Sequence, residues 1–294
     1  AVGLGLNYEV SGKSMFYRIQ LAIANKLIFS KWREALGGQM RVIVSGGAAL
    51  QPRLAKVFTA ARIPVLEGYG LTETSPVVAV NTFDKGGTAF GTVGKPLANV
   101  EVKIADDGEI LVKGPNVMKG YYMEPDQTAA VIDTDNWFHT GDIGRLEPEG
   151  HLRITGRKKE IFKTSLGKYI SPAQIENKFT ESPMIDALMV VGENQKYAAA
   201  LIVPDFTYLR TWCQENQVKY STNEEMVGQK PVRDLFKREV DHFNTFLGNT
   251  EKIMNFDIMG KEWSVENGEL TASLKLRRNF IMEKYAGEVE GLFK

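Results

Sequence analysis

The chain has 294 residues, and its 36 Lys and Arg residues balance 36 Asp and Glu residues, so the formal net charge is zero. Apolar residues make up 43% and charged residues 24%, which is ordinary for a folded protein and excludes an intrinsically disordered chain. The absence of net positive charge argues against nucleic acid as a partner. The length predicts about two domains.

A single cysteine, Cys213, excludes an internal disulfide and any zinc site built on paired thiolates. The best apolar run, residues 197–204, is much shorter than the roughly 20 residues that a membrane-spanning helix needs. Residues 1–10 contain neither an initiating Met nor the basic stretch and apolar core of a signal peptide. We therefore expect a cytoplasmic protein and a truncated chain, with sequence missing before Ala1.

The first half of the chain contains a strand, helix, strand pattern. Residues 40–47 form a β-branched segment that ends in two glycines, and a helical segment, residues 52–62, follows. A second strand, residues 63–66, runs into the glycine-rich residues 67–70. This order predicts a parallel α/β sheet with a right-handed crossover. Both glycine-rich turns should lie at its carboxyl edge, where open α/β sheets bind ligands.

Two hairpins are predicted next. Residues 101–114 alternate polar and apolar side chains around Asp106-Asp107-Gly108, and residues 142–157 repeat the pattern around a Pro-Glu-Gly turn. The alternation predicts an antiparallel, barrel-like β subdomain after the partial parallel sheet. We place the domain boundary at residues 155–157.

The remaining chain predicts a small α+β domain. Ser171 and Pro172 are typical of a helix start, and that helix should reach about Thr180. We expect two strands and three further helices, the last of them a single terminal helix, at residues 187–191, 198–203, 208–217, 231–247 and 277–293.

Residues 68–74 bring glycines, an aromatic ring, a hydroxyl and a carboxylate together at a strand end. Tyr69 can stack on a base, Thr72 can bond a phosphate, and Glu73 can hold a hard cation such as Mg²⁺. The alternative interpretation is a glycine-bounded turn followed by an acidic helix cap. Residues 45–48, Ser-Gly-Gly-Ala, carry the same ambiguity between a ligand-contacting turn and a simple tight turn.

Three later segments add charged candidates. Asp142 follows a glycine and can accept hydrogen bonds from two ribose hydroxyls, although an Asp beside Gly is also a common turn residue. Residues 156–168 combine a flexible joint at Gly156 with basic side chains, so that Arg157 can grip a nucleotide; a solvated basic hairpin is the alternative. Lys275 follows a small polar stretch that suits a mobile loop, although most lone lysines simply face solvent.

In this order, the segments resemble the adenylate-forming (ANL) superfamily of acyl-CoA synthetases, luciferases and peptide-synthetase adenylation domains. The matching motifs are Ser45-Gly46-Gly47-Ala48, Tyr69-Gly70-Leu71-Thr72-Glu73, Thr140-Gly141-Asp142, residues 156–160 with Gly167, Lys168 and Pro172, and Lys275. The long segment at residues 206–260, with residues 249–256 and 270–277, resembles the long-chain fatty acyl-CoA synthetases. The resemblance implies that residues 1–156 are the C-terminal part of a large AMP-binding domain. Residues 157–294 would be a mobile C-terminal domain that pivots at Gly156.

The resemblance implies a two-step ligase reaction. A fatty acid carboxylate attacks the α-phosphate of ATP to give an acyl-adenylate and pyrophosphate, and CoA then displaces AMP. By this resemblance, Thr72 would contact phosphate, Glu73 would bind Mg²⁺, and Asp142 and Arg157 would hold the ribose. The loop carrying Gly167 and Lys168 would meet the incoming CoA. The residues that would frame the adenine and the acyl-adenylate are Gly46, Gly47, Ala48, Gly68, Tyr69 and Gly70. Lys275 would stabilise the charge that develops during adenylation. A fatty substrate also implies peripheral membrane contact.

One family motif is absent from the sequence. The family cradles ATP phosphates with a Ser/Thr/Gly-rich loop ending in Pro-Lys-Gly, and no such loop occurs in these residues. We therefore expect the isolated chain to be at best feebly active. Two alternatives stay open, which are a nucleotide-binding or partner-binding module without activity and an adenylation enzyme for another carboxylic acid.

Overall fold

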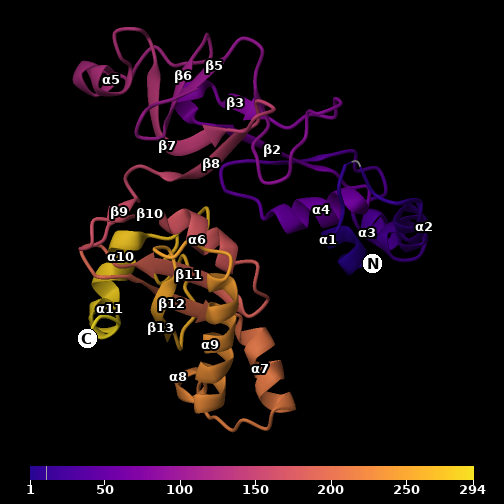
Figure 1. Ribbon diagram of the computed structural model, residues 1–294, viewed down its shortest axis with the longest axis vertical. Helices are drawn as coiled ribbons and strands as arrows, with labels where there is room; N and C mark the ends of the chain where they lie inside the picture. The colour runs from indigo at the N-terminus through magenta and orange to yellow at the C-terminus, as the bar shows by residue number, and fades with distance from the viewer. Residues whose placement is uncertain (11) are drawn as a thin grey trace. The chain divides into compact units, whose positions relative to one another are not determined.

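The computed structural model describes residues 1–10 and 12–294. The chain forms two compact units, Ala1–Lys158 and Lys159–Lys294 (Figure 1). The division falls two residues after the boundary expected from the sequence. Among the described residues, no helix is both long and apolar enough to span a membrane.

The first unit begins with helices that the sequence analysis did not predict. They are α1 (Val2–Leu6), α2 (Met15–Ala24), the π-helical segment η1 (Asn25–Phe29) and α3 (Ser30–Ala35). Phe29 is fully buried and clusters with Ala61 and Ile63, which follow helix α4 (Pro52–Ala60). The buried Asn25 amide donates to the Ala60 carbonyl at 2.8 Å, so the helices are tied to the end of α4.

The expected strand, helix, strand unit is confirmed. Strand β1 (Ile43–Ser45) pairs in parallel with β2 (Val65–Gly70), and α4 connects them. Strand β2 then pairs antiparallel with β3 (Val77–Val80), which pairs with the short β4 (Lys95–Pro96). The sheet is therefore mixed, in the order β1-β2-β3-β4.

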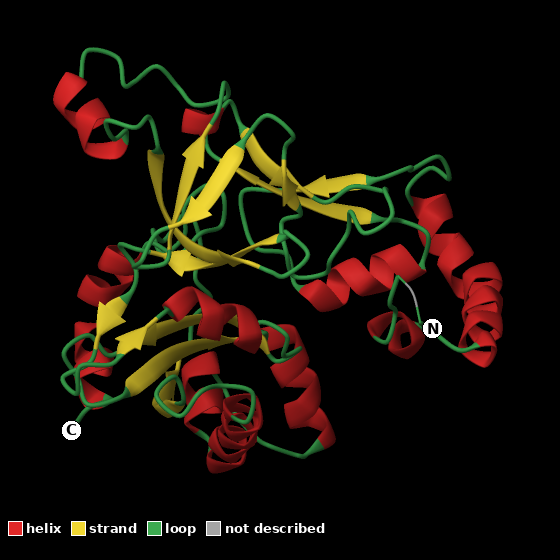
Figure 2. Cartoon of the chain, turned by 45° about the horizontal axis from the view of Figure 1, so that its top comes forward, coloured by secondary structure: helices red, strands yellow, loops and turns green. Residues whose placement is uncertain are grey.

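The two predicted hairpins are also confirmed and form one antiparallel half-barrel sheet (Figure 2). Its strands are β5 (Glu101–Ile104), β6 (Glu109–Lys113), β7 (Phe138–Leu146) and β8 (Leu152–Arg157), and the short helix α5 (Pro125–Val131) precedes β7. The apolar core of the sheet contains Ile110, Phe138 and Leu152. Gly156 is buried within β8 opposite Ile143, so the structure does not place the expected flexible joint there.

The second unit is built on a three-stranded sheet in the order β11-β12-β13. Strand β12 (Ala198–Pro204) lies in the centre and is buried along its whole length. It pairs antiparallel with β11 (Ile185–Val191) and parallel with β13 (Ile253–Ile258), a strand that the sequence analysis missed. A separate pair, β9 (Phe162–Lys163) and β10 (Tyr169–Ile170), precedes this sheet.

Helices cover both faces of the β11–β13 sheet. Alternate β12 residues face two separate apolar clusters, because side chains on a strand point to opposite faces in turn. Helices α6 (Pro172–Phe179), α7 (Phe206–Glu215), α8 (Asn223–Gly228) and α9 (Lys230–Asn244) pack on one face, and α10 (Arg278–Lys284) and α11 (Ala286–Gly291) pack on the other (Figure 1). The prediction of one continuous terminal helix was wrong, since the helix is interrupted at Tyr285.

A matched pair of glycine substitutions tests the packing beside β8. Gly94 and Gly150 have nearly the same positive φ, +84° and +85°. A Cβ at Gly94 would lie 2.0 Å from the Val80 carbonyl carbon, whereas a Cβ at Gly150 would meet nothing within 4 Å. We expect Gly150→Ala to lower the free energy of unfolding by about 1–2 kcal/mol, the cost of the left-handed backbone alone. Gly94→Ala should lower it by more than about 4 kcal/mol.

Urea denaturation of both variants measures this difference. The uncrowded Gly150 site serves as the control for backbone strain, because the steric clash at Gly94 separates the two substitutions. Equal losses of stability would contradict the described packing of residues 91–94.

Candidate functional site

The two glycine-rich turns of the first unit lie side by side, as the parallel pairing of β1 and β2 requires. Ser45 stands opposite Glu67 in the register. A Cβ built on Gly46 would lie 3.4 Å from the Gly68 carbonyl oxygen, so the turns approach closely. Gly46, Gly47 and Ala48 are exposed, which leaves their backbone open to a ligand.

A buried carboxylate, Asp142, joins the two sheets of the first unit. The Tyr69 hydroxyl on β2 donates to Asp142 Oδ2 at 2.7 Å, and Arg157 Nε on β8 donates to Asp142 Oδ1 at 2.9 Å. Asp142 is only 5% exposed. Burial, followed by the Asp142 charge, raises the pKa of Tyr69, so the phenol keeps its proton and stays a donor. The structure thus brings three predicted site residues into direct contact.

Thr72 and Glu73 lie on the short 3₁₀ turn η2 (Thr72–Thr74), immediately after β2. Thr72 is exposed and Glu73 is half-buried. The Tyr121 hydroxyl donates to Glu73 Oε1 at 3.0 Å, and the Met118 N–H donates to the Glu73 carbonyl at 2.8 Å. The Glu73 carboxylate is therefore oriented by residues that come well after it in the chain, which the sequence analysis did not predict.

Among residues 1–10 and 12–294, no group of three or more His, Cys, Asp or Glu side chains has a metal-binding arrangement. The sequence predicted one carboxylate, Glu73, for Mg²⁺, and the described residues add no further carboxylates to it that would complete a metal-binding group. Mg²⁺ is commonly held by one or two carboxylates together with substrate phosphates and water.

Glu67 is a buried glutamate that sequence reasoning missed. Its Oε1 accepts a hydrogen bond from the Leu50 N–H at 3.3 Å, which ties β2 to the loop that follows Ala48. Burial raises the pKa of Glu67 to about 7, and the nearby Arg153 charge and backbone donors at Leu50 and Gly91 only partly offset it. A glutamate directly after the apolar residues of a predicted strand is the signal that could have marked it.

The remaining candidates lie on two turns of the second unit. Gly167 and Lys168 occupy the exposed turn between β9 and β10, where the Thr164 N–H donates to the Lys168 carbonyl at 2.9 Å. Lys275 ends a second turn, in which its own N–H donates to Thr271 Oγ1 at 3.0 Å. The Lys275 side chain is exposed rather than buried inside its own unit.

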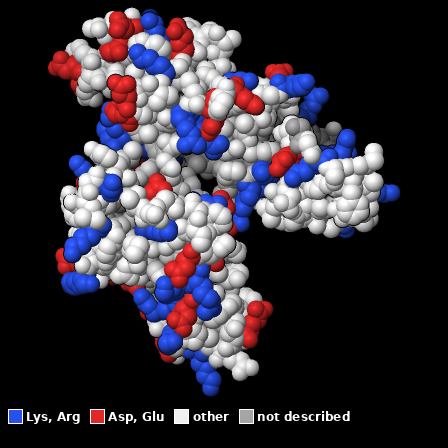
Figure 3. Space-filling model, in the orientation of Figure 1, with Lys and Arg blue, Asp and Glu red and all other residues white. Residues whose placement is uncertain are grey.

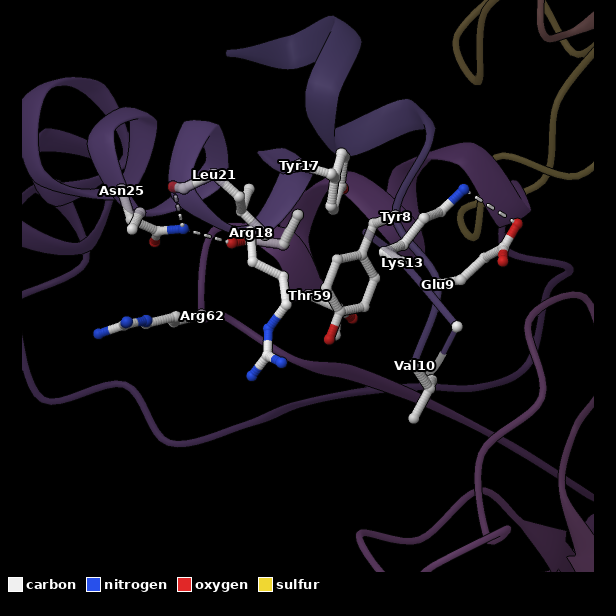
Figure 4. A pocket seen from close by; sticks show the side chains of 13 residues that line it. Tyr8, Glu9, Val10, Lys13, Tyr17, Arg18, Leu21, Asn25, Thr59 and Arg62 are labelled. Carbon is white, nitrogen blue, oxygen red and sulfur yellow. Dashed lines mark hydrogen bonds and ion pairs between the residues drawn. The ribbon is translucent and has the colours of Figure 1, made fainter. Parts of the chain in front are cut away.

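Two cavities lie apart from these contacts. One, of about 450 Å³, is lined by the N-terminal segment, α2 and α4 (Figure 4). Arg18 and Arg62 contribute to its wall, and Glu9 pairs with Lys13 at 3.4 Å. The other, of about 580 Å³, lies in the second unit between the start of β9 and α10. Figure 3 shows acidic and basic side chains intermixed on the visible face, with no single charge dominating.

Comparison with solved structures identifies the fold. The adenylation domain of a carboxylate reductase from Mycobacterium chelonae matches with a TM-score of 0.71 at 23% identity, covering 99% of this chain and 43% of that one. A two-domain piece of a carboxylic acid reductase from Segniliparus rugosus, in complex with AMP, matches with a TM-score of 0.68 at 22% identity. This match covers 95% of the present chain and 40% of the reductase piece. The fold is therefore that of adenylation domains.

Sequence comparison identifies the family. The model of the AMP-binding enzyme matches residues 13–122, and the model of the AMP-binding enzyme C-terminal domain matches residues 159–294. The chain belongs to this family of AMP-binding, adenylate-forming enzymes, as its motifs indicated.

Curated relatives include the long-chain-fatty-acid–CoA ligase FadD15 of Mycobacterium bovis, 37% identical over 286 residues, which cover 96% of this chain and 47% of the relative. Long-chain-fatty-acid–CoA ligase 6 of Mus musculus is 35% identical over 291 residues, which cover 92% of this chain and 41% of the relative. The chain spans about half the length, or less, of these relatives.

The raised pKa of Glu67 predicts a pH-dependent stability. An unfolded glutamate loses its proton near pH 4.5, whereas folded Glu67 keeps it up to about pH 7. Between these values the folded state binds more protons, so this group makes the free energy of unfolding fall as pH rises. Glu67→Gln cannot titrate. We expect the stability of the variant relative to wild type to increase by about 2 kcal/mol between about pH 5 and about pH 8.

Urea denaturation at the two pH values checks this expectation. Any constant loss from the altered hydrogen bonds cancels when the two pH values are compared. Glu149→Gln, in the exposed turn between β7 and β8, is the control and should show no such change. A stability difference for Glu67→Gln that does not vary with pH would refute the assignment.

Proposed function

We propose that the chain is part of an ATP-dependent long-chain fatty acid–CoA ligase. The reaction would join a fatty acid to ATP with release of pyrophosphate, and CoA would then displace AMP from the acyl-adenylate. Family membership and the names of the relatives, long-chain-fatty-acid–CoA ligases, support this substrate class. The observation that carries the proposal is the Asp142 carboxylate, buried and oriented by Tyr69 and Arg157.

In this proposal Asp142 accepts hydrogen bonds from the ribose hydroxyls of ATP. A carboxylate has about four lone-pair sites, and Tyr69 and Arg157 occupy only one on each oxygen. The remaining capacity suits two adjacent hydroxyl donors. The Tyr69 ring and the neighbouring backbone of Gly46, Gly47, Ala48, Gly68 and Gly70 would frame the adenine and the acyl-adenylate.

The phosphate side of the site would use residues after β2 and a residue of the second unit. Thr72 would bond a phosphate oxygen, and Glu73 would hold Mg²⁺. When bound, Mg²⁺ would neutralise charge on the departing pyrophosphate. Lys275 would stabilise the charge that develops at the α-phosphate, an effect typically worth a few kcal/mol of barrier. Its exposure on a turn agrees with such a role.

The thioester step would use the second unit again. We propose that residues 157–294 change position between the two steps, as the family resemblance implies, and that the turn carrying Gly167 and Lys168 then meets CoA. The proposed cellular setting is the cytoplasm, with peripheral membrane contact to reach a fatty substrate.

A second candidate function is a nucleotide-binding module without turnover, or adenylation of another carboxylic acid. The absence of a Pro-Lys-Gly phosphate loop from the sequence favours weak activity, because the main clamp for pyrophosphate is then lacking. We therefore propose that the 294-residue chain alone is at best feebly active.

Exchange of labelled pyrophosphate into ATP tests the proposal. We expect slow, palmitate-dependent exchange, far below the rate of a full-length ligase, and none with leucine. Lys275→Met should lower the exchange rate by about a hundredfold, since it removes a charge at the reacting phosphate.

The matched control is Lys261→Met, which alters another exposed lysine of the same unit and should leave the rate unchanged. Exchange that is insensitive to Lys275→Met would exclude the proposed role of Lys275. AMP binding without any exchange would favour the binding module instead.

A further inference from the structure

Glu109 is a buried carboxylate at the start of β6 that sequence reasoning did not single out. It is 4% exposed, yet both of its oxygens are hydrogen-bonded. Oε1 accepts from the Gly141 N–H at 2.9 Å, and Oε2 accepts from Lys158 Nζ at 2.9 Å and lies 3.1 Å from His139 Nδ1. Buried charge is tolerated when it is paired in this way.

Gly141, whose backbone N–H donates to the Glu109 side chain, lies in an irregular part of β7. Leu111 stands opposite His139, whereas Glu109 stands opposite Ile143, so β7 carries two more residues than β6 over this stretch. The extra residues form a bulge centred on Gly141, whose φ is +70°. Bulges of this kind re-aim the side chains that they carry.

The bulge leads directly into Asp142. Two further hydrogen bonds hold the bulge. The Gly141 carbonyl accepts from the Lys158 N–H at 2.8 Å, and the Asp142 N–H donates to Thr140 Oγ1 at 3.1 Å. The Glu109 side chain supplies the acceptor for the Gly141 N–H. Asp142, which contacts Tyr69 and Arg157, thus directly follows a bulge residue to which Glu109 is hydrogen-bonded.

The charge balance around Glu109 favours its ionised form. Burial opposes ionisation, but hydrogen bonds from Lys158, His139 and Gly141 outweigh it and lower the pKa of Glu109. Lys158 also pairs with Asp107 Oδ2 at 2.7 Å, so the cation is held between two carboxylates. Asp107 is half-exposed, and its carboxylate bonds Lys158 and the Glu109 N–H, at 3.1 Å, rather than the bulge, which makes it a useful control.

We propose that Glu109 is a positioning residue, which fixes the Gly141 bulge and so holds Asp142 in the orientation that receives the ribose. The ribose role of Asp142 rests on the function proposed above. Glu109 itself does not touch the nucleotide in this account. Its hydrogen bond to Gly141, rather than its charge, is the element that matters.

Three variants of the full chain separate the hydrogen bond from the charge. Glu109→Leu removes both, and Glu109→Gln keeps an acceptor for the Gly141 N–H without the charge. Asp107→Asn removes the charge of the other carboxylate that pairs with Lys158 and keeps an oxygen for the Glu109 N–H. Amide hydrogen exchange at Gly141 is measured by NMR, AMP affinity by calorimetry, and overall stability by thermal melting.

In Glu109→Leu, we expect Gly141 exchange to rise by about tenfold or more and AMP affinity to fall by about fivefold or more, because a hydrogen bond to a carboxylate is lost. Glu109→Gln and Asp107→Asn should stay within about twofold of wild type in both readouts. Recovery of AMP affinity in Glu109→Gln distinguishes positioning from a general contribution of the charge to stability.

The proposal is overturned if Glu109→Leu leaves Gly141 protected, whether or not AMP affinity changes. It is also overturned if Glu109→Gln loses AMP affinity while Gly141 stays protected. If Glu109→Leu does not fold, Glu109→Asp replaces it, since its shorter side chain withdraws the carboxylate and should raise Gly141 exchange. If the wild type binds no AMP, the proposed function fails, whereas Gly141 exchange still decides whether Glu109 fixes the bulge.

Discussion

One buried carboxylate, Asp142, constrains the architecture of the first unit. A charge that is removed from water must be paired or hydrogen-bonded, and Asp142 obtains its partners from both sheets, Tyr69 from the α/β sheet and Arg157 from the half-barrel. The two sheets must therefore keep a fixed spacing at this point. The glycine-rich turns at Gly46 and Gly68 lie at the same sheet edge. The hydrogen bond from Tyr69 therefore also ties the Asp142 carboxylate to the strand that carries one of these turns.

Local patterns predicted much of the fold. The β-branched strand before Gly46 and the turn at residues 106–108 each signal their structure within a few residues, so the parallel unit and the hairpins were predicted correctly. The candidate residues Tyr69, Asp142 and Arg157 also came from the sequence, through motif order. Their mutual contact did not, because Tyr69 and Asp142 are 73 positions apart and no local pattern encodes their pairing.

Features that depend on distant partners were missed. Strand β13 mixes apolar and polar residues, such as Asn255 and Asp257, and becomes a strand because β12 offers it a buried edge. Gly156 suggested flexibility in the sequence, yet strand pairing with Ile143 fixes it inside β8. A lone glutamate such as Glu109 looks like a surface residue of an alternating strand until its partners on β7 and after β8 are known.

Calorimetric titrations of the wild-type chain and of Asp142→Ala with AMP and with 2′,3′-dideoxy-AMP test whether Asp142 recognises ribose hydroxyls. We expect wild type to bind AMP about tenfold or more tightly than the dideoxy analogue, because the analogue cannot make the two hydrogen bonds to the carboxylate. Asp142→Ala should bind both nucleotides with equal, weak affinity. Undiminished discrimination in Asp142→Ala would exclude ribose recognition by this carboxylate.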